Sequence, residues 1–294
     1  MNNIFLLHTH YLPKALLKTA NVVGAIIVPD FYSDMNLLYW NRPNNYSDLI
    51  SYIEDEIIQL PTTTVWNYSI ENINMINGIE LSQVKKLGVI SIQLFHNKDN
   101  VYYSYNNGLT ISGISLLNEL SINKFILDLS HVNEVHLLEI CKFYNGKICI
   151  SHCGCSELYF RKQKRTNSIS KAVLTSLSDF QNVYFGIAFL NDISCEIESE
   201  QNDEVITENI ANQLILFKNI IQSERIMLGP DYFNIEYFSK KFNAKLKIPH
   251  NLYDNSGFES LKQSLRNKKM SEIEIDNIFY KNGTSFILDS RGIK

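Results

Sequence analysis

Eight short apolar runs recur along the chain, and turn residues and a helical pattern follow most of them. The runs cover residues 4–7, 24–28, 63–68, 89–94, 125–129, 147–151, 183–188 and 226–228. Continuous apolar runs are typical of parallel strands buried on both faces, and their alternation with helices indicates repeated βα units. Eight such units predict an α/β fold of the (β/α)8, or TIM-barrel, type.

The segments between the runs carry helical signals. We expect helices at 132–143, 168–177 and 208–223, the first of them ending at Asn145-Gly146. Ser271 and Glu274 form a capping-box pattern, which predicts a last helix that stops by Asn282-Gly283. The acidic stretch at 196–204 is expected to be an exposed loop.

The length of 294 residues allows one large domain or two small ones. Because one barrel needs all eight units, we expect a single domain over residues 1–294, with closing helices at about 255–294.

Composition excludes several classes of protein. The chain is 45% hydrophobic and 20% charged with a net charge of −4, so it is too apolar for a disordered chain and too acidic to hold nucleic acid by charge. No apolar run reaches ~18 residues and the first residues lack a basic segment, so we expect no membrane partner and no signal peptide. Five cysteines, an odd number, fit reduced thiols and a cytoplasmic protein.

Histidines gather where the predicted strands end, which is where active sites lie in such barrels. The residues concerned are His8, His10, His96, His131 and His152, with Asp231 after the eighth run. A single buried histidine is more often a packing residue than a ligand, but five of the seven histidines follow this rule. A His-x-His pair on a strand places both imidazoles on one face, which suits zinc or another divalent ion. A metal there would lower the pKa of a water to about 7, and the hydroxide could attack an amide carbonyl.

The remaining polar residues are assigned no catalytic role. His136 lies on a predicted helix and His250 in a loop, where packing or exposure is the simpler interpretation. The Cys-x-Cys pair at 153–155 lacks the second pair that a structural zinc site needs. Asp128 is expected to support His131 or its strand end as a hydrogen-bonding neighbour.

Several motifs together resemble the membrane (renal) dipeptidase family of zinc metallopeptidases, of which the chain looks like a diverged member. They are LDLSH (127–131), ISH (150–152), QLFHN (93–97), GLTISG (108–113), GPDY (229–232) and the start of the last helix (270–272). The order of these motifs, and the spacing of 21 positions from His131 to His152, match the family. The resemblance implies a barrel of the metal-dependent hydrolase type that binds two zinc ions bridged by a glutamate and cleaves dipeptides.

The resemblance also assigns metal ligands. His131 and His152 would bind one zinc ion and His8 the other, while His10 stands where the family has an aspartate. Glu71 is the nearest candidate for the bridging carboxylate, although the family's Glu-Gly pair is absent. The resemblance is therefore compatible with either one or two bound zinc ions.

Substrate contacts follow from the same resemblance. His96 would stabilise the developing oxyanion, and Asp231 would bind the α-amino group and transfer a proton. Arg165 would hold the substrate carboxylate through paired hydrogen bonds, with Arg161 as a rival for that role.

The sequence therefore predicts a zinc-dependent, dipeptidase-like hydrolase acting on a dipeptide or another small peptide, modified peptides included. A second hypothesis is a catalytically impaired family member that binds a peptide or a partner protein, motivated by His10 and by the missing Glu-Gly pair. The family also raises the alternative of a homodimer, which no residue pattern establishes.

Overall fold

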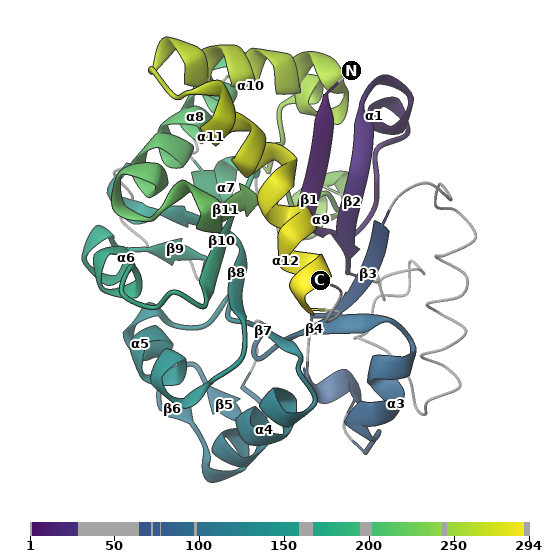
Figure 1. Ribbon diagram of the computed structural model, residues 1–294, viewed down its shortest axis with the longest axis vertical. Coiled ribbons are helices and arrows are strands. Elements are labelled where there is room, and N and C mark those ends of the chain that lie inside the picture. The colour runs from purple at the N-terminus through teal and green to yellow at the C-terminus, as the bar shows by residue number, and fades with distance from the viewer. Residues whose placement is uncertain are drawn as a thin grey trace.

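Each barrel strand pairs in parallel with the next, and the last pairs with the first (Figure 1). The computed structural model describes residues 2–28, 65–71, 73–76, 78–96, 99–158, 167–194, 202–233, 235–242 and 246–290. In these ranges the barrel order is β1 (Asn3–Thr9), β2 (Asn21–Ile27), β3 (Val65–Ile70), β4 (Val89–Gln93), β7 (Ile126–Asp128), β8 (Ile148–Cys155), β10 (Val183–Ile187) and β11 (Ile226–Leu228). The predicted (β/α)8 barrel is confirmed, and each predicted run overlaps one of its strands.

Helices surround the barrel and follow its strands in the chain (Figure 1). They are α1 (Lys14–Thr19), α3 (Leu81–Lys86), α4 (Ile111–Ile122), α5 (Glu134–Phe143), α6 (Lys171–Leu177), α7 (Asn191–Ser194), α8 (Asp203–Ile220), α9 (Ile235–Phe242), α10 (Asn255–Asn267), α11 (Glu272–Asp276) and α12 (Asn282–Ser290). Single helical turns lie at η1 (Ile73–Ile76), η2 (Ser156–Leu158), η3 (Ser223–Arg225), η4 (His250–Tyr253) and, as a π-helical turn, η5 (Asn277–Lys281). Among the described residues no helix has both the length and the apolar character needed to cross a bilayer.

Short strands complete the architecture. β5 (Tyr103–Ser104) and β6 (Gly108–Leu109) form an antiparallel pair before α4, and β9 (Ser168–Ile169) pairs in parallel with the carboxyl end of β8. The helix expected at 168–177 therefore begins only at Lys171, where the Ser170 side chain caps it.

Two predicted boundaries are wrong for identifiable reasons. Helix α8 begins at Asp203 rather than near 208, because the Asn202 side chain accepts a hydrogen bond from the Val205 N–H. Asp203 and Glu204 thus occupy the first turn of a helix, where acidic residues are favourable, instead of a loop. The rest of that acidic stretch, 196–201, lies outside the described residues.

The predicted stop at Asn282-Gly283 is also wrong, since the last helix continues through the π-helical turn η5 into α12. The capping box at Ser271 is present as expected. Asn282 is buried and its amide donates to the carbonyl oxygens of Ser223 and Ile226, beside the start of β11. Gly283 lies so close to Phe5 that a Cβ would come within 1.9 Å of the ring. These two residues serve close packing against the barrel rather than helix termination.

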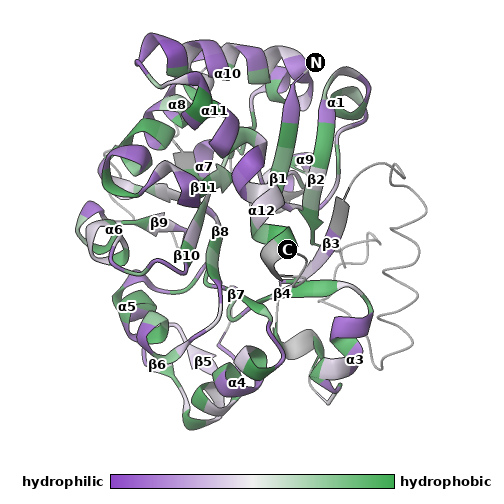
Figure 2. Ribbon diagram, in the orientation of Figure 1, coloured by the Kyte–Doolittle hydropathy of each residue, from purple (hydrophilic) through white to green (hydrophobic). Residues whose placement is uncertain are grey.

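Two apolar clusters separate the inside of the barrel from its outside. The larger lies between the strands and the surrounding helices. The smaller fills the amino-terminal half of the barrel and consists of Phe5, Leu7, Ile26, Ile90, Ile126, Cys149, Met227 and, from α12, Phe286 and Ile287. Figure 2 shows β1, β2 and β4 as hydrophobic along most of their length, and α12 crossing the barrel end that faces the viewer. Helix α12 therefore closes the end of the barrel opposite the histidines.

Irregular pairing in β1 and β8 decides which side chains face the carboxyl end of the barrel. In β1 the step from Leu6 to Thr9 matches a shorter step from Ala25 to Ile27 in β2, so β1 carries one extra residue there. In β8 the step from 150 to 153 matches the shorter step from 185 to 187 in β10. Extra residues of this kind are β-bulges, which re-aim side chains. Strict alternation after the inward-facing Leu7 would turn His8 outward, whereas the bulge brings it inward.

Two glycines make room for the bulge in β8. A Cβ at Gly186 or at Gly229 would lie 1.9 Å from the carbonyl oxygen of Ser151. Both glycines have ordinary backbone angles, so their role is spatial. The Ser151 carbonyl therefore occupies space that side chains from β10 and from the segment after β11 would otherwise fill.

Replacing Gly229 by alanine is expected to lower the free energy of unfolding by about 3 kcal/mol or more, because a methyl group would overlap a backbone carbonyl that the barrel holds in place. Chemical denaturation measures this loss. Gly78→Ala is the control: its Cβ would meet nothing within 4 Å, and its φ of +84° costs only backbone strain of roughly 1–2 kcal/mol. A smaller loss at Gly229 than at Gly78 would contradict the spatial role.

Candidate metal centre

Seven acidic and imidazole side chains meet at the carboxyl end of the barrel. They are His8 and His10 from the end of β1, Glu71 after β3, His96 after β4, His131 after β7, His152 in β8 and Asp231 after β11. All but His131 are buried, and His131 is partly buried. The structure thus brings together every metal-ligand and catalytic residue that the sequence singled out, and Arg165, the predicted carboxylate-binding residue, lies outside the described residues.

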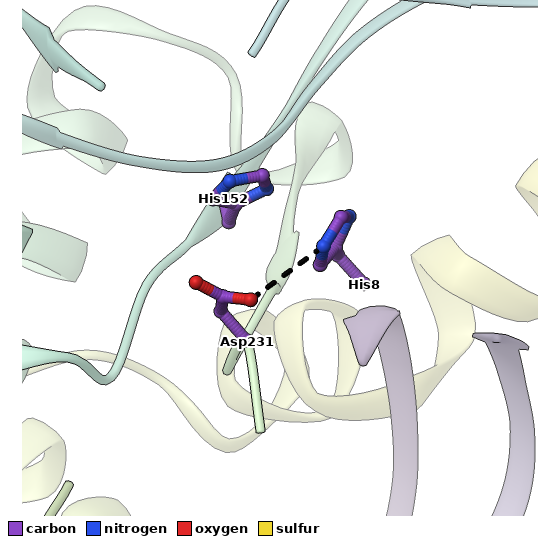
Figure 3. A group of neighbouring side chains, drawn as sticks. All are labelled: His8, His152 and Asp231. Atoms are coloured by element: carbon purple, nitrogen blue, oxygen red, sulfur yellow. Dashed lines mark ion pairs between the residues drawn. The ribbon is translucent and has the colours of Figure 1, made fainter. Parts of the chain in front are cut away.

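Distances within this group are those of neighbouring ligands. The His8 Nε2 atom lies 3.6 Å from one carboxylate oxygen of Asp231 (Figure 3). The His10 Nε2 atom lies 3.5 Å from the same oxygen. Glu71 Oε1 lies 3.4 Å from His96 Nε2 and 3.9 Å from His10 Nε2. The three side chains in Figure 3 point toward one another from three different parts of the chain.

Three overlapping groups could each hold a metal ion. They are His8 with His152 and Asp231, His8 with His10 and Glu71, and Glu71 with His96 and His131, in each of which the ligand atoms lie within 4.8 Å of one another. Glu71 belongs to two groups, as a bridging carboxylate would. His96 and Asp231, expected only as substrate and proton-transfer residues, also lie at ligand distance.

The donor atoms fit a divalent cation. His8 Nε2 is buried and makes no hydrogen bond within the described part of the chain. His131 Nε2 and His152 Nε2 lie 3.1 Å apart, a separation compatible with two imidazoles binding one ion at about 2.0–2.1 Å. Imidazole nitrogens combined with carboxylate oxygens are the ligands of zinc and similar ions.

Two residues of the group have a left-handed backbone conformation. His131 has a φ of 64° and Asp231 a φ of 58°, which costs free energy for residues with a side chain and is common at functional sites. Asn167 stabilises the first, since its side-chain oxygen accepts the His131 N–H at 2.6 Å and its nitrogen lies 3.3 Å from His131 Nε2. The Asp231 N–H donates to the His8 carbonyl oxygen, which ties the second to β1.

A second layer of polar groups lies beneath the imidazoles. Asp128 accepts hydrogen bonds from the backbone N–H groups of Ser130 and Ser151 and from the Ser151 hydroxyl. The Ser151 oxygen also lies 2.9 Å from His8 Nδ1 and 3.1 Å from His152 Nδ1. The sequence hypothesis linked Asp128 to His131 or to its strand end. The bond from the Ser130 N–H, just after β7, agrees with the strand-end alternative, and further hydrogen bonds lead through Ser151 to His8 and His152. The sequence analysis assigned Ser151 no role. Its position directly before His152, in a motif that matched the family, could have indicated one.

Burial dominates the electrostatics of the site. It lowers the pKa of His8, His96 and His152 well below the usual value, and neighbouring histidines lower it further. Burial also lowers the pKa of His131, to about 4. For Asp231 burial raises the pKa, but the surrounding histidines outweigh it and the net shift is downward. At neutral pH His8, His96, His131 and His152 are therefore neutral and Asp231 is ionised.

The other residues named from the sequence have different outcomes. Arg165 and its rival Arg161 lie outside the described residues, so the carboxylate-binding role stays a prediction. His136 hydrogen bonds to the Tyr103 hydroxyl, and His250 is exposed beside Asp203.

Comparison with known sequences indicates no function for the chain. No protein-family model matches the chain. A Klebsiella pneumoniae protein, named only as an uncharacterized protein in the pqqA 5′ region, is 23% identical over 216 residues, which cover 70% of this chain and 73% of that protein.

Solved structures are similar over almost the whole chain. An amidohydrolase from Pseudomonas aeruginosa superposes with a TM-score of 0.74 at 17% identity, covering 99% of this chain and 95% of that one. A dipeptidase described as a metallo peptidase of family M19 superposes with a TM-score of 0.72 at 14% identity, covering 99% of both chains. At these identities the similarity establishes the fold, and it confirms a barrel like those of the dipeptidase and the amidohydrolase.

The buried histidines predict how stability depends on pH in the metal-free protein. Unfolded imidazoles take up protons near pH 6.5, whereas folded His131 does so only near pH 4. The unfolded state therefore binds more protons between these values, and the free energy of unfolding falls as the pH falls, by about 2 kcal/mol at pH 5 from His131 alone.

Denaturant titrations of chelator-treated protein at pH 7 and pH 5 measure this effect. His131→Gln is expected to reduce the difference between the two pH values, and His250→Gln, which removes an exposed histidine, to leave it unchanged. Equal stability of the wild type at both pH values would contradict neutral burial of the cluster.

Proposed function

We propose that the protein is a metal-dependent hydrolase that cleaves an amide bond in a dipeptide or another small peptide. The observation that carries the proposal is the set of three metal-capable groups linked through His8 and Glu71 at the carboxyl end of the barrel. Active sites of such barrels lie at this end. Structural similarity to an amidohydrolase and to a dipeptidase supports the reaction class.

Zinc is the proposed metal, because neutral imidazoles and carboxylates predominate among the donors. His8, His10 and Glu71 would hold one ion, and His131 and His152 with the shared Glu71 would hold a second. A zinc ion in such a site supplies Lewis acidity: it lowers the pKa of a water and polarises a carbonyl oxygen.

The chain's own side chains supply the remaining steps. Asp231 is ionised at neutral pH, so it can accept a proton from the attacking water and return it to the leaving amine. It can also pair with the α-ammonium group of a peptide. His96, whose Nε2 faces Glu71, would donate a hydrogen bond to the oxygen that becomes negative as the carbonyl is attacked. Arg165 would bind the terminal carboxylate.

One observation favours a second candidate function. His10 contributes an imidazole ring at 3.5 Å from Asp231, where the dipeptidase family has an aspartate. The loss of one negative charge weakens the attraction for two divalent ions. A protein that binds a peptide or a partner without cleaving it is therefore the alternative, and the substrate, whether a plain or a modified peptide, is set by contacts beyond the metal ligands.

Removal of the metal is expected to abolish hydrolysis of dipeptides, and zinc addition to restore it. Glu71→Gln should lower the zinc content and reduce the rate on the order of 100-fold, because the amide cannot supply a charged oxygen to two ions. Metal analysis and a panel of dipeptides measure both quantities. Hydrolysis that survives chelation, or zinc-loaded protein without activity on any peptide, would contradict the proposed enzyme.

Asp231→Asn is expected to lower kcat on the order of 100-fold or more, because the amide neither accepts nor returns the proton. Measured alongside, the zinc content separates this role from ligation. Retained zinc with reduced kcat supports proton transfer, and loss of zinc together with activity assigns Asp231 to the metal instead. Asp203→Asn, which alters an aspartate beside exposed His250, is the control.

A further inference from the structure

The Ser151 hydroxyl contacts so many polar groups that only certain positions of their protons can satisfy every hydrogen bond. Its oxygen lies 2.5 Å from Asp128 Oδ2, 2.9 Å from His8 Nδ1, and 3.1 Å from both His152 Nδ1 and the Ser130 hydroxyl oxygen. All five side chains are buried, with exposed fractions of 1% or less. Water therefore cannot substitute for a missing partner, and the positions of the protons must satisfy all four contacts together.

The proton positions follow from counting donors and acceptors. A serine hydroxyl donates one hydrogen bond and accepts two. Asp128 is the acceptor for the hydroxyl proton, because a carboxylate only accepts, and its other oxygen already receives the N–H groups of Ser130 and Ser151. The Ser130 hydroxyl takes no lone pair of Ser151, because its proton goes to Asp128 and its oxygen accepts the His152 N–H. The two lone pairs of Ser151 are then left for the two imidazoles, and each of them must donate from Nδ1.

We infer that Ser151 is a positioning residue that holds His8 and His152 in the same tautomer, with the proton on Nδ1 and the lone pair on Nε2. Both Nε2 atoms face the carboxyl end of the barrel, since His8 Nε2 lies 3.6 Å from Asp231 and His152 Nε2 lies 3.1 Å from His131 Nε2. One hydroxyl thus prepares two nitrogens from different strands to bind a cation.

The barrel backbone keeps this hydroxyl in place. Ser151 lies at the bulge of β8, and its carbonyl oxygen fills the space left by Gly186 and Gly229. Asp128 lies at the end of β7, the neighbouring strand, and is held by two backbone N–H groups. The orientation of the two imidazoles therefore depends on main-chain geometry and is set before any ion binds. That this orientation serves metal binding rests on the proposed function.

Asp128→Asn makes a specific prediction. The asparagine oxygen would keep the two backbone N–H groups, so its NH2 group would face Ser151 and donate to it. The serine oxygen would then have one lone pair left, and its proton would go to one imidazole. One of the two histidines is therefore expected to switch to the tautomer with its proton on Nε2. Ser151→Ala removes the shared partner of both.

NMR of the metal-free protein labelled with ¹⁵N-histidine, at neutral pH, reports the tautomer of each ring. The signals are assigned by their loss in His8→Gln and His152→Gln. In the wild type both rings are expected to carry the proton on Nδ1, in Asp128→Asn one ring is expected to switch, and in Ser151→Ala both are expected to lose a single defined state. The matched control is Ser91→Ala, a buried serine on β4, which is expected to leave both rings unchanged.

Zinc affinity, measured by competition with a chromogenic chelator, is the second readout. Ser151→Ala and Asp128→Asn are expected to bind zinc about 10- to 100-fold more weakly than the wild type and Ser91→Ala, as is typical when a hydrogen-bonding partner of a ligand is removed. A proton on Nε2 of either wild-type ring, or unchanged tautomers in both variants, would overturn the inference. If Asp128→Asn does not fold, Ser151→Ala decides. Wild-type rings protonated on Nδ1 in a protein without zinc affinity would leave the tautomer assignment standing and overturn the metal function.

Discussion

The inward direction of His8 and His152, and with it the histidine cluster, depends on one extra backbone residue in each of β1 and β8. The bulge in β8 turns both Ser151 and His152 toward the inside of the barrel, and it pushes the Ser151 carbonyl into space that is free only because positions 186 and 229 are glycines. A similar extra residue in β1 turns His8 inward after the buried Leu7. Ordinary alternation along either strand would direct these imidazoles into the layer between strands and helices. Local irregularity in an otherwise regular barrel therefore creates the cluster.

Burying seven titratable groups close together costs free energy. The fold offsets this cost by keeping rings neutral and by apolar packing elsewhere in the barrel. Burial keeps His8 and His152 neutral, so they do not repel each other, and a hydrogen bond from His10 helps to hold Asp231 ionised. Apolar packing inside the amino-terminal half of the barrel, sealed by Phe286 and Ile287 of α12, supplies stability at the opposite end. The strained, left-handed backbone at His131 and Asp231 therefore lies at the carboxyl end of the barrel, and the dense apolar packing lies at the amino-terminal end.

Much of the fold could be predicted from the chain's pattern because strands and helices of a barrel are local events. Each buried parallel strand is a continuous apolar run, and the eight runs correspond to the eight strands. Boundaries were less predictable where tertiary contacts compete with local signals. Asn282-Gly283 has the composition of a helix end, yet the amide of Asn282 binds backbone carbonyls near β11 and Gly283 packs on Phe5, so the helix continues.

By itself the sequence determined the strand-end positions of five histidines, Glu71 and Asp231, and therefore that they would share one end of a closed barrel. Tertiary structure decided which atoms face one another: Glu71 between His10 and His96, Asp231 between His8 and His10, and Asp128 linked through Ser151 to His8 and His152 rather than to His131. The physical reason is that side-chain direction along a strand depends on register, and a single bulge, invisible in the apolar pattern, reverses it.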